Sequence, residues 1–179
     1  MTSSSPERFD AGFYRRFYLD PRTRVVTRAE MARRAEFIAA FARHGRQPVR
    51  RILDVGCGLG LMRAPLLRHF PRASYTGLEA SAYLCERHGW KQGSAATFSA
   101  ARPFDLVICH DVLQYLADRE AAAALRNLAR LCRGVLHFGY MLTIAMLVMV
   151  FVVFVAHMLG GRPVVETLLF AVALAVGLS

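Results

Sequence analysis

A short apolar run that ends in an acid and a glycine-rich turn constrains this 179-residue chain more than any other feature. The run covers residues 49–55 and predicts a buried strand, and residues 61–69 after the turn predict a helix. Gly56 and Gly58 permit a tight turn and let the backbone approach a ligand, because glycine has no Cβ. Gly60 lets the helix pack close to the strand. The segment therefore predicts a strand–loop–helix unit that holds a ligand at the carboxyl end of the strand.

Strand and helix patterns alternate along the chain after this unit. The predicted elements are a strand at 73–78, a helix at 81–88, strands at 91–93 and 104–109, a helix at 118–132 and a strand at 134–138. This order implies an α/β fold in which helices cover both faces of an open parallel sheet. In such sheets the ligand binds outside the carboxyl ends of the strands.

Residues 1–48 are predicted to form an N-terminal region that precedes the sheet. Its segment 9–21 is dense in aromatic and Arg side chains, which fits either a short helix packed on the core or a lid over a pocket; packing is the favoured interpretation. Thr27, with Glu30 three residues later, is typical of a capping box and predicts a helix over 27–44. The apolar stripe of that helix is predicted to be Met31, Ala35, Ile38 and Phe41 or Ala42.

A second acid follows the second predicted strand. Glu79 lies 19 residues beyond Gly60. A carboxylate at that place can accept both hydrogen bonds of a ribose diol. Alternatively, Glu79 caps the helix that follows it. Because the glycine-rich loop precedes it at the right spacing, ribose binding is the interpretation that we prefer.

Three separate segments resemble class I S-adenosylmethionine-dependent methyltransferases. Residues 51–60, Arg-Ile-Leu-Asp-Val-Gly-Cys-Gly-Leu-Gly, are similar to the first motif of that family, and Glu79 falls where the family has its ribose-binding acid. Residues 104–116 resemble the family's fourth strand and the turn after it, and residues 133–139 resemble its fifth strand. The resemblance covers about residues 10–138 and implies a Rossmann-like fold. A nicotinamide dehydrogenase normally has Gly-x-Gly-x-x-Gly, a different spacing that receives a pyrophosphate.

The same resemblance implies roles in a site for the cofactor S-adenosylmethionine. Asp54 would order the loop and help to hold the methionine amino group, and Glu79 would bind the ribose. The loop residues assigned to the cofactor are Gly56, Cys57, Gly58 and Gly60. Ser94 falls near the family's acid that contacts the adenine amino group. An acid is commoner there, so this position departs from the family pattern.

Two side chains at the end of the fourth predicted strand are candidates for catalysis. Methyl transfer from a sulfonium is an in-line displacement that needs positioning and desolvation, and a base only where the acceptor must lose a proton. His110 is the first candidate base and Asp111 the second. The alternative is that both only shape the pocket. The family often has a His at the position of Tyr115, and this sequence does not.

The end of the chain differs sharply in composition from the rest. All but one of the 23 Lys and Arg residues, and all but one of the 13 Asp and Glu residues, lie before residue 134. Residues 140–159 carry no charge and, as a helix, would span about 30 Å, the thickness of the hydrocarbon layer. Residues 164–178 form a second apolar run that only Glu166 interrupts. We therefore expect a C-terminal transmembrane helical hairpin in residues 140–179, with the basic N-terminal domain in the cytoplasm.

The second half of this tail, residues 163–178, is similar to a membrane hairpin of magnesium-transporting P-type ATPases. Their phosphorylated motif, Asp-Lys-Thr-Gly, is absent from the sequence, so this chain alone cannot accept the phosphoryl group of a pump. The helix and two strands that usually complete a class I methyltransferase sheet are not found before the tail. We therefore expect a truncated core in residues 49–139 that is joined to the tail near residue 139 as a chimera, through gene fusion, a frameshift or sequence assembly.

Taken together, the sequence predicts a methyltransferase that is tethered to the membrane through residues 140–178 and acts on a small-molecule or lipid acceptor. The alternatives are a catalytically inactive cofactor-binding membrane protein and a chimeric fragment of a P-type cation-transporting ATPase. The net charge of +10 comes from scattered Arg residues without a nucleic-acid reader motif, so we do not expect a nucleic-acid partner. The four cysteines form no Cys-x-x-Cys pair, and we expect no metal site.

Overall fold

Five parallel strands form a sheet in residues 9–139, the part of the chain that the computed structural model describes. These residues belong to the first of two units, Met1–Gly139 and Tyr140–Ser179. The strands are β1 (Arg51–Val55), β2 (Ser74–Glu79), β3 (Lys91–Gln92), β4 (Phe104–His110) and β5 (Cys132–Gly139). Their order across the sheet is β3-β2-β1-β4-β5. The predicted open parallel sheet is therefore confirmed.

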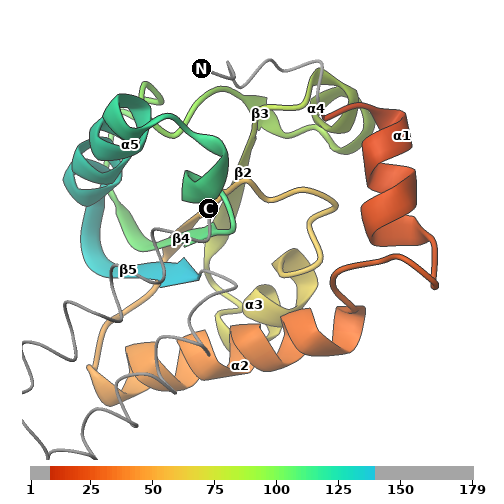
Figure 1. Ribbon diagram of the computed structural model, residues 1–179. Helices are drawn as coiled ribbons and strands as arrows, with labels where there is room; N and C mark the ends of the chain where they lie inside the picture. The colour runs from red at the N-terminus through yellow and green to blue at the C-terminus, as the bar shows by residue number, and fades with distance from the viewer. Residues whose placement is uncertain (1–8, 140–179) are drawn as a thin grey trace, which may run out of the picture. The chain divides into compact units, whose positions relative to one another are not determined.

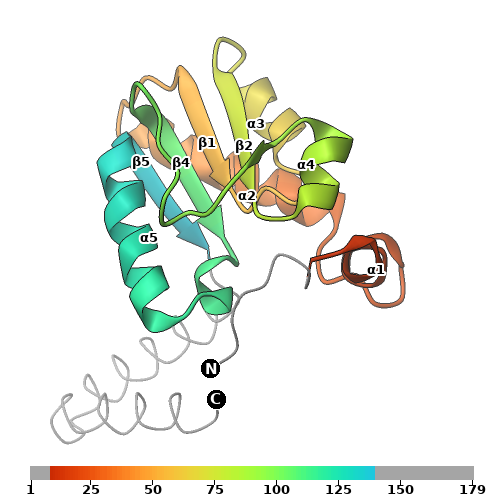
Figure 2. The ribbon, with the colours of Figure 1, turned by 90° about the horizontal axis from the view of Figure 1, so that it is seen from above.

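Helices cover both faces of this sheet, as predicted. Figures 1 and 2 show α2 (Arg28–His44), α3 (Arg63–His69) and α4 (Ala82–His88) on one face, and α5 (Asp118–Leu131) on the other. The observed ends differ from the predicted ones by at most two residues, which is the usual disagreement at element boundaries. The largest shifts are at β1, β5 and the start of α3.

The strand register brings the predicted site residues to one edge of the sheet. On β1, Asp54 lies beside Gly77 of β2 and Ile108 of β4. Glu79 is the last residue of β2, and His110 is the last residue of β4. Because all neighbouring strands are parallel, their carboxyl ends meet at the same edge, which is where a ligand binds in such a fold.

Alternate residues of the central strands fill two separate cores. Ile52 and Ile108 point to the α2 and α3 face, where they pack with Leu66. Leu53 and Val107 point to the α5 face, with Leu128 of α5 among their neighbours. All of these side chains are at most 1% exposed. This period of two places the β1 backbone between two dry layers, so its carboxyl end is held firmly in position.

The predicted capping box at the start of α2 is present. The Thr27 hydroxyl accepts from the Glu30 backbone N–H at 3.2 Å, and the Glu30 carboxylate accepts from the Thr27 backbone N–H at 2.6 Å. The predicted apolar stripe needs one correction, because the Phe41 side chain is 58% exposed whereas Ala42, the alternative, is fully buried. Small residues at 35, 39 and 42 let the helix approach the sheet closely, and that contact turns Phe41 outward.

The aromatic segment before α2 forms a short helix, α1 (Ala11–Tyr14), that continues into one π-helical turn, η2 (Arg15–Leu19). Within residues 9–139, no helix has both the length and the apolar character that crossing a membrane requires. The two predicted membrane spans, and the similarity to a P-type ATPase hairpin, lie outside the described residues.

Candidate functional site

Three left-handed glycines shape the loop after β1. Gly56, Gly58 and Gly60 have φ values of +66°, +52° and +67°, a region that L-residues with a side chain rarely occupy. The Gly56 backbone N–H donates to the Leu78 carbonyl at 2.8 Å, which fixes the start of the loop against β2. A Cβ on Gly56 would lie 2.3 Å from Cγ2 of Val112, whereas a Cβ on Gly58 would meet nothing closer than 3.9 Å. The side of Gly58 on which a Cβ would stand is therefore open, which leaves room for a ligand beside the loop.

Trp90 supports this loop from one side, a role that the sequence did not suggest. Its indole N–H donates to the Gly58 carbonyl at 2.9 Å. Its ring lies so close to Gly60 and Gly77 that a Cβ on either would approach ring atoms to 2.6 or 2.7 Å. Two glycines are thus needed because one tryptophan packs against both. The only sequence signal for this support was the presence of a tryptophan just before the third strand.

Glu79 lies at the centre of the predicted cofactor site and is 5% exposed. Its Oε2 accepts from the Gly58 backbone N–H at 2.9 Å, which joins the tip of β2 to the glycine loop. Its Oε1 accepts from the backbone N–H groups of Ala80 and Ser81, at 2.9 and 3.0 Å. The Tyr14 hydroxyl adds a longer contact, at 3.4 Å. The carboxylate thus contacts both the loop and the two residues that precede α4, and ribose binding by Glu79 stays a prediction.

Asp54 is also buried, with 3% of its surface exposed. Burial raises the pKa of its carboxyl to about 7, although a hydrogen bond from the Tyr75 hydroxyl at 2.5 Å acts in the opposite direction. The nearby Glu79 carboxylate raises it further. A cationic group next to Asp54 would lower this raised pKa and so favour the ionised carboxylate.

Cys57 contributes only backbone to the loop. Its side chain is 9% exposed, and its Sγ lies 2.8 Å from the place of a Cβ on Gly77, under the loop. Burial raises the pKa of this thiol strongly. A protonated, buried thiol is a poor nucleophile, so we assign no chemistry to it.

The N-terminal aromatic segment packs beside Glu79. Phe9 anchors it, because the Ser81 hydroxyl donates to the Phe9 carbonyl at 2.6 Å. Tyr14 is 4% exposed, and burial followed by the Glu79 charge raises the pKa of its phenol. Burial, with smaller contributions from Tyr115 and Asp111, raises the pKa of Tyr18 to about 12. The favoured interpretation, packing, is therefore confirmed, and two of the packed phenols lie next to site residues. A lid over a pocket stays a prediction.

Ser94 is held by α5 and not by the glycine loop. Its hydroxyl contacts the Glu120 carboxylate at 3.4 Å and accepts from the Ala96 backbone N–H at 3.1 Å. Asn127 of α5 fixes the same loop through the carbonyls of Ala95 and Phe98, both at 2.9 Å. Ser94 follows β3, where the adenine contact was predicted. The Glu120 side chain of α5 supplies a carboxylate next to it.

His110 and Asp111 occupy the carboxyl end of β4. The ring of His110 stacks on that of His137 from β5, with centroids 5.0 Å apart. Arg34 of α2 reaches both predicted residues through Nη1, which lies 3.5 Å from His110 Nδ1 and 3.7 Å from an oxygen of Asp111. Burial, then His137 and Arg34, lowers the pKa of His110 to about 3. Asp111 has a φ of +53°, an uncommon conformation for a residue with a side chain.

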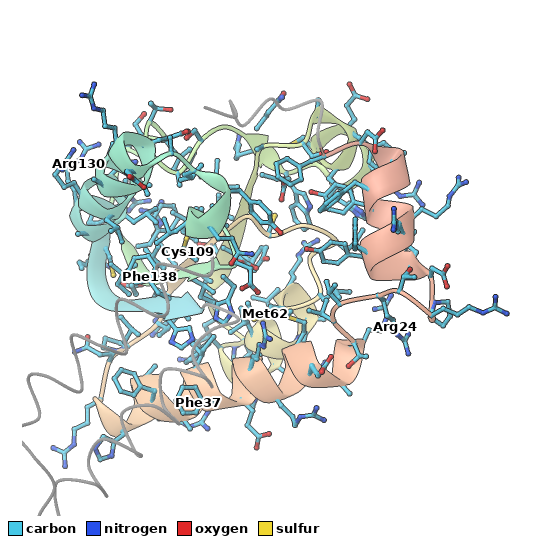
Figure 3. The ribbon with its side chains drawn as sticks, in the orientation of Figure 1. Arg24, Phe37, Met62, Cys109, Arg130 and Phe138 are labelled. Atoms are coloured by element: carbon cyan, nitrogen blue, oxygen red, sulfur yellow. The ribbon has the colours of Figure 1, made fainter. Side chains whose placement is uncertain are left out.

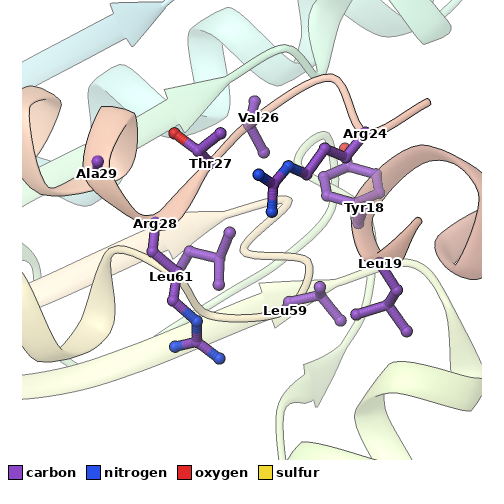
Figure 4. A pocket seen from close by; sticks show the side chains of 9 residues that line it. All are labelled: Tyr18, Leu19, Arg24, Val26, Thr27, Arg28, Ala29, Leu59 and Leu61. Atoms are coloured by element: carbon purple, nitrogen blue, oxygen red, sulfur yellow. The ribbon is translucent and has the colours of Figure 1, made fainter. Parts of the chain in front are cut away.

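A hollow lies between the aromatic segment and the outer side of the glycine loop (Figure 4). Leu59 and Leu61 line it from the loop, and Arg24 and Arg28 line it from the connection into α2. Tyr18 also lines the hollow, and its phenol interacts electrostatically with Asp111 and Glu79 of the candidate site. Among residues 9–139, no three His, Cys, Asp or Glu side chains come together in a way that could hold a metal ion.

The described geometry therefore joins most of the predicted residues through direct contacts. Glu79 is hydrogen-bonded to Gly58 of the loop at the ends of β1 and β2, whereas the nearby Asp54 carboxylate is bonded to Tyr75. His110 and Asp111 lie at the neighbouring end of β4 and share Arg34. Ser94 is placed farther along the edge, after β3. The residues that the sequence did not single out are Trp90, Tyr75, Arg34, His137 and Glu120.

Part of this chain is similar to known methyltransferases. Residues 53–134 match the profile of a family described as "Methyltransferase domain". Trans-aconitate 2-methyltransferase of Deinococcus radiodurans is 33% identical over 93 residues, which are 48% of this chain and 33% of that protein. The enzyme of the same name from Pseudomonas paraeruginosa is 31% identical over 91 residues, 47% of this chain and 33% of that protein. The chain thus spans about a third of the length of these curated relatives.

Solved structures give the same result for the fold. The sugar N-methyltransferase KedS8 from Streptoalloteichus is 34% identical, with a TM-score of 0.53 over 60% of this chain and 47% of that one. CalS10, an amino pentose methyltransferase from Micromonospora echinaspora solved with bound S-adenosylmethionine, is 28% identical, with a TM-score of 0.53 over 60% of this chain and 50% of that one. The Rossmann-like methyltransferase fold expected from the sequence is therefore confirmed for the described residues.

Proposed function

We propose that this chain is an S-adenosylmethionine-dependent methyltransferase whose cofactor binds at the carboxyl ends of β1 and β2. The observation that carries the proposal is the hydrogen bond between Glu79 and the Gly58 backbone N–H, at 2.9 Å. This bond joins the glycine-rich loop after β1 to a buried acid at the end of β2. Such an arrangement suits S-adenosylmethionine, whose methionine part would lie on the loop and whose ribose would meet the acid. Similarity to the methyltransferase-domain family over residues 53–134 supports the same activity.

The charges of the site fit this cofactor. Within residues 9–139 the two ion pairs are Arg34–Asp111 and Arg133–Asp105, so neither Asp54 nor Glu79 has a cationic partner there. S-adenosylmethionine carries positive charge on its sulfonium and its amino group, and when bound it supplies an electrophilic methyl group. Asp54 would hold the amino group, and ionise more readily as a result. Glu79 would exchange some of its backbone partners for the ribose hydroxyls.

The chain's own contribution to the reaction is position and exclusion of water. The loop at residues 56–60 fixes the cofactor through backbone groups, and the aromatic segment at residues 9–19 covers the Glu79 side of the site. His110 stays neutral at physiological pH because its pKa is lowered to about 3, so it holds a proton only weakly. We therefore propose that His110 positions the acceptor and that Asp111 orients Arg34, with little general-base work from either.

Calorimetric titration with S-adenosylhomocysteine tests the cofactor site directly. We expect the wild-type chain to bind, and Glu79→Ala to weaken binding by at least about 30-fold, because hydrogen bonds to a charged group are lost. Glu86→Ala is the matched control, since it removes the same charge from an exposed position on α4. Absence of binding by the wild type, or equal affinity in all three proteins, would contradict the proposal.

The acceptor is proposed to be a small molecule, since the named relatives and neighbours act on trans-aconitate and on sugars. We further propose that residues 140–178 attach the chain to the cytoplasmic side of a membrane, an expectation supported by their composition alone. Fractionation of expressing cells tests this point. Retention in the membrane pellet after carbonate washing is expected, and release into the soluble fraction would contradict it.

A rival proposal is that the chain binds the cofactor without transferring its methyl group. A single-turnover assay distinguishes the two, because an active chain produces S-adenosylhomocysteine in an acceptor-dependent manner. Binding without such production, for every acceptor supplied, would favour the inactive alternative.

A further inference from the structure

Side chains from three elements meet at the carboxyl ends of β4 and β5, beside the proposed cofactor site. Arg34 comes from α2, His110 from the end of β4 and His137 from β5. The two imidazole rings stack at 5.0 Å, and Arg34 Nη1 lies 3.5 Å from Nδ1 of His110. Phe37, the labelled residue on α2 in Figure 3, lies 6.1 Å from the ring of His137 and limits its movement from the helix side.

The proton on His110 can be placed from these contacts. A guanidinium donates hydrogen bonds and cannot accept them, so Nδ1 of His110 must be the acceptor. The neutral ring then carries its hydrogen on Nε2. This Nε2 is buried and has no hydrogen-bond partner among the described residues. A buried donor without a partner is uncommon in a folded protein, which marks this point as the place of an acceptor atom.

Arg34 also retains donors for a ligand. Its contacts with His110 and with Asp111 both use Nη1, and its side chain is 35% exposed. Five N–H bonds are available on a guanidinium, so Nε and Nη2 face other directions. The cluster therefore offers several N–H donors and no free acceptor, since the Asp111 carboxylate already lies against Arg34 at 3.7 Å.

The charge of the cluster sets the charge of its ligand. Arg34 is its cation, and Asp111 and, one turn away on α2, Glu30 partly offset it. His137 is held neutral like His110, because burial and then Arg34 lower its pKa. Tyr18 and Cys109, which also interact with the charge of Asp111, stay protonated because their pKa values are raised. One partly offset cation matches a singly charged anion, whereas a phosphate dianion would meet too much negative charge from Asp111.

We infer that the methyl acceptor carries a carboxylate, and that Arg34, the Nε2–H of His110 and the ring of His137 form its binding site. The inference rests on the proposed methyltransferase function and names its substrate class. Two carboxylate oxygens match the paired donors of a guanidinium, and the apolar ring of Phe37 beside His137 suits a hydrocarbon body attached to the carboxylate. An amine acceptor would be repelled by Arg34 in its protonated form.

Saturation-transfer NMR with the full-length chain and saturating S-adenosylhomocysteine tests the inference. The probes are benzoate and cinnamate, each with its amide, together with benzylamine and phenyl phosphate. We expect at least one acid to bind, and its amide to bind at least about tenfold more weakly. Arg34→Gln should weaken binding of that acid at least about tenfold, and His110→Phe should weaken it by a smaller factor.

Arg33→Gln is the matched control, because Arg33 is the exposed neighbour of Arg34 on the same helix. It should leave the affinity for the acid within about twofold of the wild type. Binding of S-adenosylhomocysteine, measured first in every variant, reports the fold and tests the proposed function separately. With cofactor binding intact, the inference is overturned by failure of every acid to bind, by preference for phenyl phosphate or benzylamine, or by equal effects of Arg33→Gln and Arg34→Gln.

Discussion

The carboxyl ends of β1 and β2 and those of β4 and β5 are built in different ways. At the first pair, Glu79 accepts three backbone N–H bonds, and the loop beside it is fixed by glycines and by Trp90. At the second pair, side chains of α2, β4 and β5 contact one another, and the Nε2 of His110 is left without a partner in the described residues.

This difference separates two tasks on one sheet edge. A cofactor is the same molecule in every turnover, so a rigid backbone cradle suits it, because little order has to be imposed when it binds. An acceptor must be recognised by its particular chemistry, which side chains supply. We therefore expect changes at the first pair of strand ends to affect folding and cofactor binding together. Changes at the second pair should affect neither strongly.

Gly56→Ala is the substitution expected to have the largest effect at the cradle. It combines a left-handed φ of +66° with a Cβ only 2.3 Å from Val112, and together these cost about 2–5 kcal/mol of unfolding free energy. Gly89→Ala is the control, because its φ is +69° but nothing lies within 4 Å of its Cβ. That variant should lose only about 1 kcal/mol in urea denaturation. Similar losses in the two would argue against a tightly packed loop.

Asp54→Asn should change how stability depends on pH. The folded-state pKa of Asp54 is about 7, against about 4 for an unfolded Asp. Between these values the unfolded chain releases a proton that the folded chain keeps, so rising pH destabilises the wild type until about pH 7 and no further. The asparagine variant lacks this slope, and the difference amounts to a few kcal/mol at most.

Urea denaturation of both proteins at pH 5, 6, 7 and 8 measures this difference. The stability of the wild type relative to the variant should fall over the first three points and level off at the last. S-adenosylhomocysteine, through its amino group, should reduce the fall. Parallel curves for the two proteins would show that Asp54 is ionised throughout and that its burial is not decisive.

Trp90→Phe tests how much the support beneath the loop contributes. The phenyl ring keeps part of the contact with Gly60 and Gly77 but loses the N–H bond to the Gly58 carbonyl. We expect a loss of about 1 kcal/mol in stability and a three- to tenfold weaker affinity for S-adenosylhomocysteine. Unchanged affinity in titration calorimetry would mean that the loop keeps its shape without Trp90.

Tyr14→Phe is expected to have the smallest effect. The hydroxyl contact with Glu79 is long, at 3.4 Å, and the carboxylate keeps its three backbone donors. The affinity for S-adenosylhomocysteine should change less than threefold, and stability by less than about 0.5 kcal/mol. A larger loss of affinity or stability would show that the aromatic segment helps to form the cofactor site, which the long contact does not indicate.

The fold could be predicted because its signals are local. Short apolar runs marked the central strands β1 and β4, and the capping box at Thr27 and Glu30 marked the start of α2. The exposed side of α2 was harder to predict. Helical spacing allowed Phe41 or Ala42 on the buried face, and only the close approach of α2 to the sheet decided for Ala42.

The site could be predicted in part, for the same reason. Asp54, the loop glycines and Glu79 follow strand ends, so their meeting depends only on a parallel sheet. The contact of Arg34 with His110 joins residues 76 positions apart, and that of Tyr75 with Asp54 depends on strand register. Neither spacing nor composition encodes such contacts, because they depend on how α2 and β2 come to lie against β1.

The order of the strands also bears on how the chain is made. β1 is central, yet its two neighbours begin at residues 74 and 104, and the edge strand β5 ends at residue 139. When the chain has left the ribosome only as far as residue 100, β1 can pair with β2, but its other edge has no partner because β4 has not yet emerged. Such distant pairings form slowly, so a nascent chain of this length offers an unpaired strand to chaperones until the second half of the sheet emerges.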